Sequence, residues 1–269
     1  MTLEWVKNLA FARMPKIDAK WMNPEWVRNL AFARMPKIDA QVVGGTHRHE
    51  VIRTLAGANN IGIELGVAQG VFAERMLRSG KFARYFGVDC YGDPWGTPEY
   101  KAALKRIGLS APFHLLHMTF EEALGLFEDE YFDFIYIDGF AETGEEGGRT
   151  LYGWYRKLKV GGVIAGDDYH PDWPLVMWAV NDFAAQTGEP LFCTELTERI
   201  AYCNYPSWFL TKSAPFDKEA GPPPELVEVG RREGLRVHRQ RTRPQLRRGV
   251  IRALEVMGVK DSVKKLLRR

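Results

Sequence analysis

From Asn60 onward, short apolar runs alternate with segments whose apolar residues recur at helical spacing. Runs such as FDFIYID and GGVIAGD are nearly continuous in apolar residues, which is typical of strands buried on both faces of a parallel sheet. The intervening helices should then cover both faces. The predicted strands are 61–66, 83–89, 112–118, 132–138 and 161–167, and the predicted helices are 69–79, 97–107, 120–127, 145–158 and 173–187.

Two further strands follow these alternating segments, at PLFCTELT (190–197) and SWFLTK (207–212). The span between them is too short for a crossover helix, so they should pair antiparallel. The pattern predicts a doubly wound, Rossmann-like α/β sheet of about seven strands with an antiparallel last strand. GPPP at 221–224 marks its end. We therefore divide the chain into an N-terminal helical segment (1–57), an α/β domain (58–220) and a C-terminal tail (221–269).

The N-terminal segment contains a tandem repeat with an offset of 21 residues. EWVKNLAFARMPKIDAK (4–20) recurs as EWVRNLAFARMPKIDAQ (25–41), and two copies are too few to stack into a solenoid. Each copy predicts a short amphipathic helix that ends before Met-Pro. Such a helix can cover one face of the core, or it can serve as a substrate lid or dimer contact.

Composition narrows the class of protein. A chain of 269 residues, 45% hydrophobic and 26% charged, suits one α/β domain of ordinary size. No apolar run reaches the roughly 18 residues of a membrane span, and no secretory signal is visible, so we expect a cytoplasmic protein. Cys90, Cys193 and Cys203 are odd in number and lack CxxC spacing, which favours reduced thiols over disulfides or zinc.

The basic charge of the chain is concentrated in the tail. Residues 231–269 carry 14 Lys and Arg against 3 Asp and Glu, a net of +11, so residues 1–230 sum to −8 within the chain total of +3. Leu246, Val250, Leu254 and Met257 form an apolar stripe, and a second short helix can begin at Asp261. The stripe can pack on the domain or a sister subunit, or bind an anionic membrane. Without interleaved aromatic residues, no nucleic-acid partner is expected.

The turn after the first predicted strand carries the first chemical signal. In ELGVAQG, Gly66 and Gly70 flank three residues and do not form the GxGxxG that cradles a pyrophosphate, which indicates a nucleoside without phosphates. Asp89 ends the next strand, where a carboxylate can accept both hydroxyls of a ribose. Glu64 can anchor the turn or contact an amino group.

Four motifs in order, ELGVAQG, GVD, FDFIYIDG and KVGGVIAGDDY, resemble those of the class I S-adenosylmethionine-dependent methyltransferases over roughly residues 58–212. The last two resemble the small-molecule O-methyltransferases of the macrocin and catechol branches. Ala68 departs from the family, since many members have a glycine there. The resemblance implies S-adenosylmethionine as cofactor, bound by Glu64, Gly66, Val67, Gln69, Gly70, Asp89, Thr119, Phe120 and Asp138. Alternatively, Phe120 is an ordinary residue of the hydrophobic core.

Three acids end the fourth and fifth strands, namely Asp138, Asp167 and Asp168. Parallel strands bring them to one edge, where they repel one another unless a cation or protons intervene. In metal-dependent O-methyltransferases, acids at these positions hold a divalent ion, so the resemblance implies a Mg²⁺ site that binds the acceptor hydroxyl. Asp138 is then also catalytic. Without metal, the acids cap helices or bind water.

The resemblance does not supply a proton acceptor, because Ala141 stands where catechol-type enzymes have a lysine. His170 is the best substitute, as its usual pKa suits a base, although a turn or core role is also open. His117 is expected as a packed strand residue, and His47 and His49 as a solvated loop or the cleft entrance. FAETGEEGGRT (140–150) can form a substrate lid or a solvated helix start.

The leading hypothesis is therefore a divalent-metal-assisted O-methyltransferase for a hydroxyl of a sugar, glycan or specialised metabolite. One alternative is a metal-independent methyltransferase acting on a phenol or nitrogen, and another is a non-catalytic cofactor-binding scaffold. Expected partners are a small hydroxylated acceptor and, through the basic tail, a membrane or other anionic surface. A homo-oligomer is also compatible with the sequence.

Overall fold

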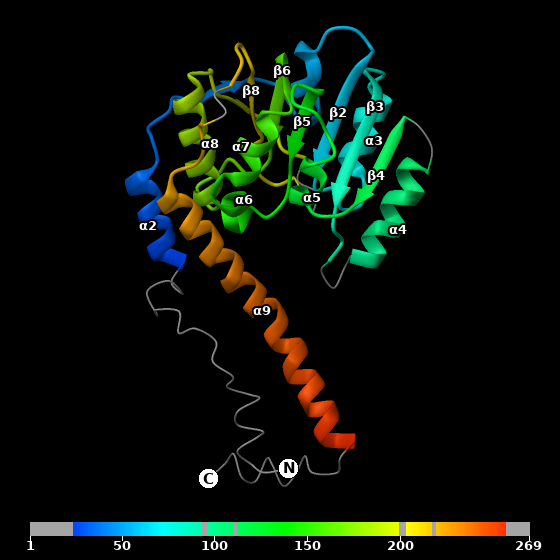
Figure 1. The fold of residues 1–269 in the computed structure, drawn as a ribbon, viewed down its shortest axis with the longest axis vertical. Coiled ribbons are helices and arrows are strands. Elements are labelled where there is room, and N and C mark those ends of the chain that lie inside the picture. The colour runs from blue at the N-terminus through cyan, green and yellow to red at the C-terminus, as the bar shows by residue number, and fades with distance from the viewer. Residues whose placement is uncertain (1–23, 93–95, 110–111, 199–202, 217–218, 257–269) are drawn as a thin grey trace.

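The computed structural model describes residues 24–92, 96–109, 112–198, 203–216 and 219–256, with side chains up to residue 240. Its core is an eight-stranded sheet of order β1-β7-β8-β6-β5-β2-β3-β4 (Figure 1). β8 runs antiparallel to β6 and β7, and the other pairings are parallel. The strands are β1 (Gln41–Val43), β2 (Asn60–Leu65), β3 (Phe82–Asp89), β4 (Phe113–His117), β5 (Phe132–Ile137), β6 (Leu158–Gly166), β7 (Phe192–Thr194) and β8 (Trp208–Thr211).

Helices cover both faces of this sheet, as the near-continuous apolar strands require. In β5, Ile135 and Ile137 point into a core that also contains α7 and α8 side chains, whereas Phe134 and Tyr136 pack with η2 and α3 on the opposite face. The helices are α2 (Pro24–Arg34), η2 (Arg48–Thr54), α3 (Val71–Arg78), α4 (Gly96–Ile107), α5 (Phe120–Leu124), η3 (Ala141–Thr143), α6 (Gly144–Gly147), α7 (Arg149–Tyr155), α8 (Pro174–Thr187) and α9 (Pro224–Val256).

The predicted doubly wound fold is confirmed, including the five parallel strands and the antiparallel pairing of β7 with β8. The sequence analysis missed β1, which pairs parallel with β7. Three residues, two of them exposed, are too few to show a strand periodicity. The segment predicted as one helix over 145–158 is divided between α6 and α7.

The second copy of the repeat forms α2. The helix ends at Arg34, directly before Met35 and Pro36. It buries Val27 and Ala31 in a third apolar cluster that also contains Leu175 and Trp178 of α8 and Leu226 of α9. The second copy is therefore a helix that covers the body of the domain, as one of the two readings expected. The first copy lies outside the described residues.

The first turns of α9 pack closely on the domain, and the rest of the helix extends away from it (Figure 1). Leu226 and Val229 are buried, and Gly230 lies against the backbone of α6. The predicted stripe Leu246, Val250 and Leu254 lies in the part of α9 where only the backbone is described, and Met257 and the second tail helix lie outside the described residues. Neither α9 nor any shorter described helix has an apolar stretch sufficient to cross a lipid bilayer.

A matched pair of glycines in α9 tests this close packing. A Cβ at Gly230 would lie 2.3 Å from the amide nitrogen of Gly147, whereas a Cβ at Gly234 would meet Thr143 Cγ2 at an ordinary 3.7 Å. We expect Gly230→Ala to reduce the free energy of unfolding by about 1–3 kcal/mol, because backbone must move to admit the methyl group. Gly234→Ala should raise it by about 0.5–1 kcal/mol through helix propensity.

Urea denaturation of both variants beside the wild-type protein measures these changes. Equal stabilisation by both substitutions would show that α9 does not pack on α6 in this way.

Candidate functional site

The turn between β2 and α3 has a backbone that few residues adopt. Gly66, Ala68 and Gly70 all have positive φ, of 96°, 44° and 74°. A Cβ at Gly66 would lie only 1.7 Å from the carbonyl oxygen of Asp138, so this position requires glycine. Ala68 tolerates the left-handed conformation at a cost in strain. The turn is therefore pressed against the end of β5.

Asp89 holds this turn in place from the end of β3. Its Oδ2 accepts hydrogen bonds from the amides of Val67 and Ala68, both at 3.0 Å, and its Oδ1 accepts one from the amide of Tyr91 at 2.8 Å. The Tyr91 hydroxyl in turn donates to the Ala68 carbonyl at 3.1 Å. Oδ1 accepts one bond here and has capacity for another, so Asp89 can both fix the turn and bind a ligand hydroxyl.

Glu64 lies beneath the same turn and is 2% exposed. Burial raises its pKa well above the usual range, while nearby Arg48 opposes that shift. Its Oε2 has no hydrogen-bond partner among the described residues. A buried carboxyl oxygen without a partner is unusual, and it is suited to accept a hydrogen bond from a bound ligand.

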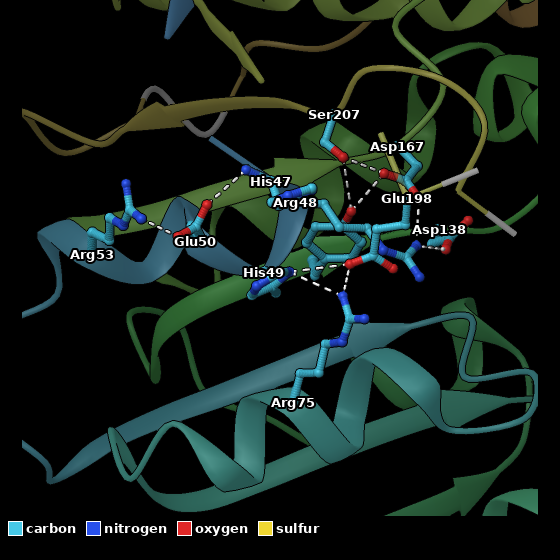
Figure 2. Close-up of polar contacts among 11 residues, drawn as sticks. His47, Arg48, His49, Glu50, Arg53, Arg75, Asp138, Asp167, Glu198 and Ser207 are labelled. Carbon is cyan, nitrogen blue, oxygen red and sulfur yellow. Dashed lines mark hydrogen bonds and ion pairs between the residues drawn. The ribbon is translucent and has the colours of Figure 1, made fainter. Parts of the chain in front are cut away.

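The three predicted acids do meet at one edge, and a cation from another part of the chain joins them. Nη1 of Arg48, in η2, lies 2.7 Å from Oδ2 of Asp167 and 3.3 Å from Oδ2 of Asp138 (Figure 2). Oδ1 of Asp167 accepts hydrogen bonds from the hydroxyls of Tyr136, at 2.6 Å, and Ser207. Both oxygens of Asp167 are thus engaged within the protein.

This arrangement does not fit the predicted Mg²⁺ site. In the described part of the chain, no three His, Cys, Asp or Glu side chains are arranged to hold a metal ion. Asp167 would have to give up Arg48 or its two hydroxyl partners to become a ligand. The repulsion among these acids predicted a need for a cation, and the described structure supplies the guanidinium of Arg48 in place of the expected metal ion.

Burial and mutual repulsion shift the titration of this edge. Burial is the largest cause that raises the pKa of Asp138, and repulsion from Asp167 is the next. The positive charge of Arg48 partly offsets this rise. Burial, Asp167 and Glu142 raise the pKa of Asp168 to about 7. Burial lowers the pKa of Arg48, but Tyr136, Asp167 and Asp138 outweigh it, so the guanidinium stays charged.

A small cavity of about 30 Å³ adjoins these acids. Asp138, Asp167 and Asp168 line it together with Glu145, and apolar side chains from α7, α8 and β8 complete the wall. Burial raises the pKa of Glu145 to about 8. Asp168 has a φ of +65°, a strained conformation for a residue other than glycine. The edge therefore presents carboxyl groups to a largely apolar cavity.

His170 is not among the residues that line this cavity. Its ring lies 4.6 Å from that of Tyr205, and its Nδ1 lies 3.2 Å from the Asp172 amide nitrogen. Of Asp168 and His170, Asp168 lines the cavity, and His170 as proton acceptor stays a prediction.

Thr119 and Phe120, which the resemblance implies as cofactor contacts, follow β4 at the start of α5. Thr119 caps α5 by accepting a hydrogen bond from the Glu122 amide, and Phe120 packs partly into the core while reaching the backbone of Gly139. His117 is exposed, so its expected packing in the strand is wrong. It stacks on Tyr100, at 5.3 Å, and approaches Tyr91 beyond Asp89. The sequence analysis missed these two tyrosines.

His47 and His49 flank Arg48 and are partly buried, so the segment is no solvated loop. Their rings stack at 5.4 Å. Nδ1 of His49 lies 3.1 Å from Oε1 of Glu198, which also contacts Arg75 (Figure 2). Burial and then Arg75 lower the pKa of His49.

The glycine-rich segment 140–150 is not a solvated helix start. Thr143, Gly144 and Gly147 are buried, with Gly144 against α8 and Gly147 against α9. Glu145 reaches back to the backbone of Gly139 and the acid cavity. The segment thus lines the site, although packing on two helices holds its glycines in place.

Comparisons with known proteins give a family match and several similar solved structures. Residues 61–169 match the family described as "Methyltransferase domain". No curated protein matches the sequence. Similar solved structures include a putative O-methyltransferase from Klebsiella pneumoniae (16% identity, 78% of this chain and 97% of that chain, TM-score 0.47), cofactor-bound Rv0187 from MTB (16%, 78% and 97%, 0.48) and precorrin 8W decarboxylase from Methanobacterium thermoautotrophicum (21%, 66% and 97%, 0.46).

Glu145 gives a test of the cavity's electrostatics. Its folded pKa of about 8 lies above the usual value of 4.5, so its contribution to stability is present below pH 4.5 and is lost as the pH rises through 8. Glu145→Gln cannot ionise. We expect the stability of Glu145→Gln relative to the wild type to improve by at least about 1 kcal/mol between pH 5 and pH 9.

Chemical denaturation of both proteins across this pH range measures the difference. Parallel stability curves for the two proteins would contradict the burial of this carboxyl.

Proposed function

We propose that the protein is a class I S-adenosylmethionine-dependent methyltransferase that methylates a hydroxyl group of a small molecule, a proposal that the match of residues 61–169 to the family described as "Methyltransferase domain" supports. The close contact between Gly66 and the Asp138 carbonyl carries this proposal. It joins the turn between β2 and α3, which would bind the cofactor, to the sheet edge that carries Asp138, Asp167 and Asp168, called here the acid edge. The motifs FDFIYIDG and KVGGVIAGDDY, which form that edge, also resemble those of O-methyltransferases.

The residues at the turn fit the cofactor. The unpartnered Oε2 of Glu64 suits the amino group of its methionine part, and the capacity left on Asp89 suits a ribose hydroxyl. Tyr91, Tyr100 and His117 offer aromatic surface beside Asp89, where the adenine would lie. When bound, S-adenosylmethionine supplies a methyl group activated by a positively charged sulfur.

Asp168 is the proposed proton acceptor. It lines the acid cavity, whereas Asp138 and Asp167 are the two acids that Arg48 bridges. As the acceptor oxygen takes the methyl group, its proton passes to the Asp168 carboxylate, whose pKa of about 7 suits a base at neutral pH. Because Asp167 is fully engaged within the protein, no step of this proposal passes through a divalent ion.

Cofactor binding is tested first, by calorimetry with S-adenosylmethionine and S-adenosylhomocysteine. We expect Gly66→Ala to weaken binding at least tenfold, because the new methyl group displaces the turn from Asp138. Gly57→Ala is the matched control, since Gly57 also has positive φ but faces open space. A wild-type protein that binds neither ligand would refute the proposed function, and unchanged binding by Gly66→Ala would refute this site.

The proton acceptor is tested by methyl transfer to a panel of catechol, simple phenols, methyl glycosides and primary amines. We expect Asp168→Asn to lower kcat by about 10²–10⁴ with cofactor affinity retained, because it removes the base but no cofactor contact. His170→Gln should change kcat less than about threefold. Loss of activity in His170→Gln with retention in Asp168→Asn would reverse the assignment, and transfer to amines alone would contradict O-methylation.

A further inference from the structure

Arg48 lies where two carboxylates converge, and little water reaches it. The side chain is 3% exposed, and its Nη1 bridges Asp138 and Asp167, which follow two adjacent strands. A buried carboxylate, that of Asp167, and a half-buried one, that of Asp138, converge here and require a positive charge or protons between them. The protein supplies that charge from a segment 90 residues before Asp138 and 119 before Asp167.

The position of Arg48 is fixed from several sides. The Glu50 carboxylate accepts a hydrogen bond from the His47 amide at 2.9 Å, which fixes the start of η2. The guanidinium lies over the ring of Phe72, in α3, at 5.3 Å. Tyr136 and Ser207 hold the opposite oxygen of Asp167. Arg48 is therefore an integral part of the acid edge (Figure 2).

We infer that Arg48 is the resident cation of the acid edge and takes the place that a divalent ion would occupy there. It acts as a positioning residue: it holds Asp138 and Asp167 as an ion-paired unit, and thereby leaves Asp168 as the carboxyl that faces the acceptor. This inference rests on the proposed function for its catalytic meaning. The structural part of the inference, that a guanidinium stands in place of a metal ion, does not depend on which acceptor is methylated.

Metal binding gives the first test. Mn²⁺ is titrated by calorimetry into the full chain saturated with S-adenosylhomocysteine, and methyl transfer is measured with EDTA or added Mg²⁺. We expect no saturable Mn²⁺ binding below about 1 mM and equal turnover in both solutions. One Mn²⁺ per chain with micromolar affinity, lost in Asp167→Asn, would overturn the inference.

Substitution of Arg48 gives the second test. We expect Arg48→Met to lower Tm by on the order of 10 °C, because it leaves the buried carboxylate of Asp167 and the half-buried one of Asp138 without their cation. Turnover should fall at least 100-fold, with partial rescue by a few millimolar guanidinium or by Arg48→Lys. Such rescue distinguishes a charge role from mere packing. Arg53→Met, in the same helix but 62% exposed, is the matched control and should change neither quantity.

A double variant keeps the test valid if Arg48→Met fails to fold. Arg48→Met with Asp167→Asn removes both buried charges, so its Tm should fall by less than the sum of the two single changes. Additive losses, or an Arg48→Met protein that matches Arg53→Met in both Tm and turnover, would overturn the inference.

Failure of the proposed function is recognised separately. The Mn²⁺ titration and the Tm coupling need no acceptor, so they report on Arg48 even if no panel compound is methylated. A wild-type protein that does not bind S-adenosylmethionine would refute the proposed function. The coupling between Arg48 and Asp167 can still be measured in that case, because it is read from Tm alone.

Discussion

The buried ion pair between Arg48 and Asp167 connects three parts of the molecule that are distant in sequence. It joins η2, which precedes the first central strand, to the ends of β5 and β6. Tyr136 and Ser207 extend it to the interior of β5 and the start of β8. Loss of either charged partner would leave an uncompensated charge in the sheet, so the edge depends on this pair being complete.

Close backbone contacts bring the turn between β2 and α3 together with the acid edge. Gly66 admits the carbonyl of Asp138, which places the turn between β2 and α3 directly beside the acid edge. Asp89 holds the turn through the amides of Val67 and Ala68. The strain at Ala68 and Asp168 lies in the two turns that would face ligands, as is common at functional sites. A rigid sheet thus supports two strained turns.

The sequence was sufficient to predict the sheet because its strands are nearly continuous apolar runs. It also placed Asp138, Asp167 and Asp168 on one edge, since the carboxyl ends of parallel strands meet there. Arg48 could not be predicted, because its partners are about a hundred residues away and η2 is too short to show periodicity. His117 was misplaced for a related reason: a strand's last residue can project beyond the core.

Anomalous diffraction from crystals soaked in Mn²⁺ with S-adenosylhomocysteine bound distinguishes a resident guanidinium from a metal site at the acid edge. We expect density for the Arg48 guanidinium between Asp138 and Asp167, and no anomalous peak beside Asp138, Asp167 or Asp168. A manganese peak coordinated by these carboxylates, with Arg48 displaced, would contradict this expectation.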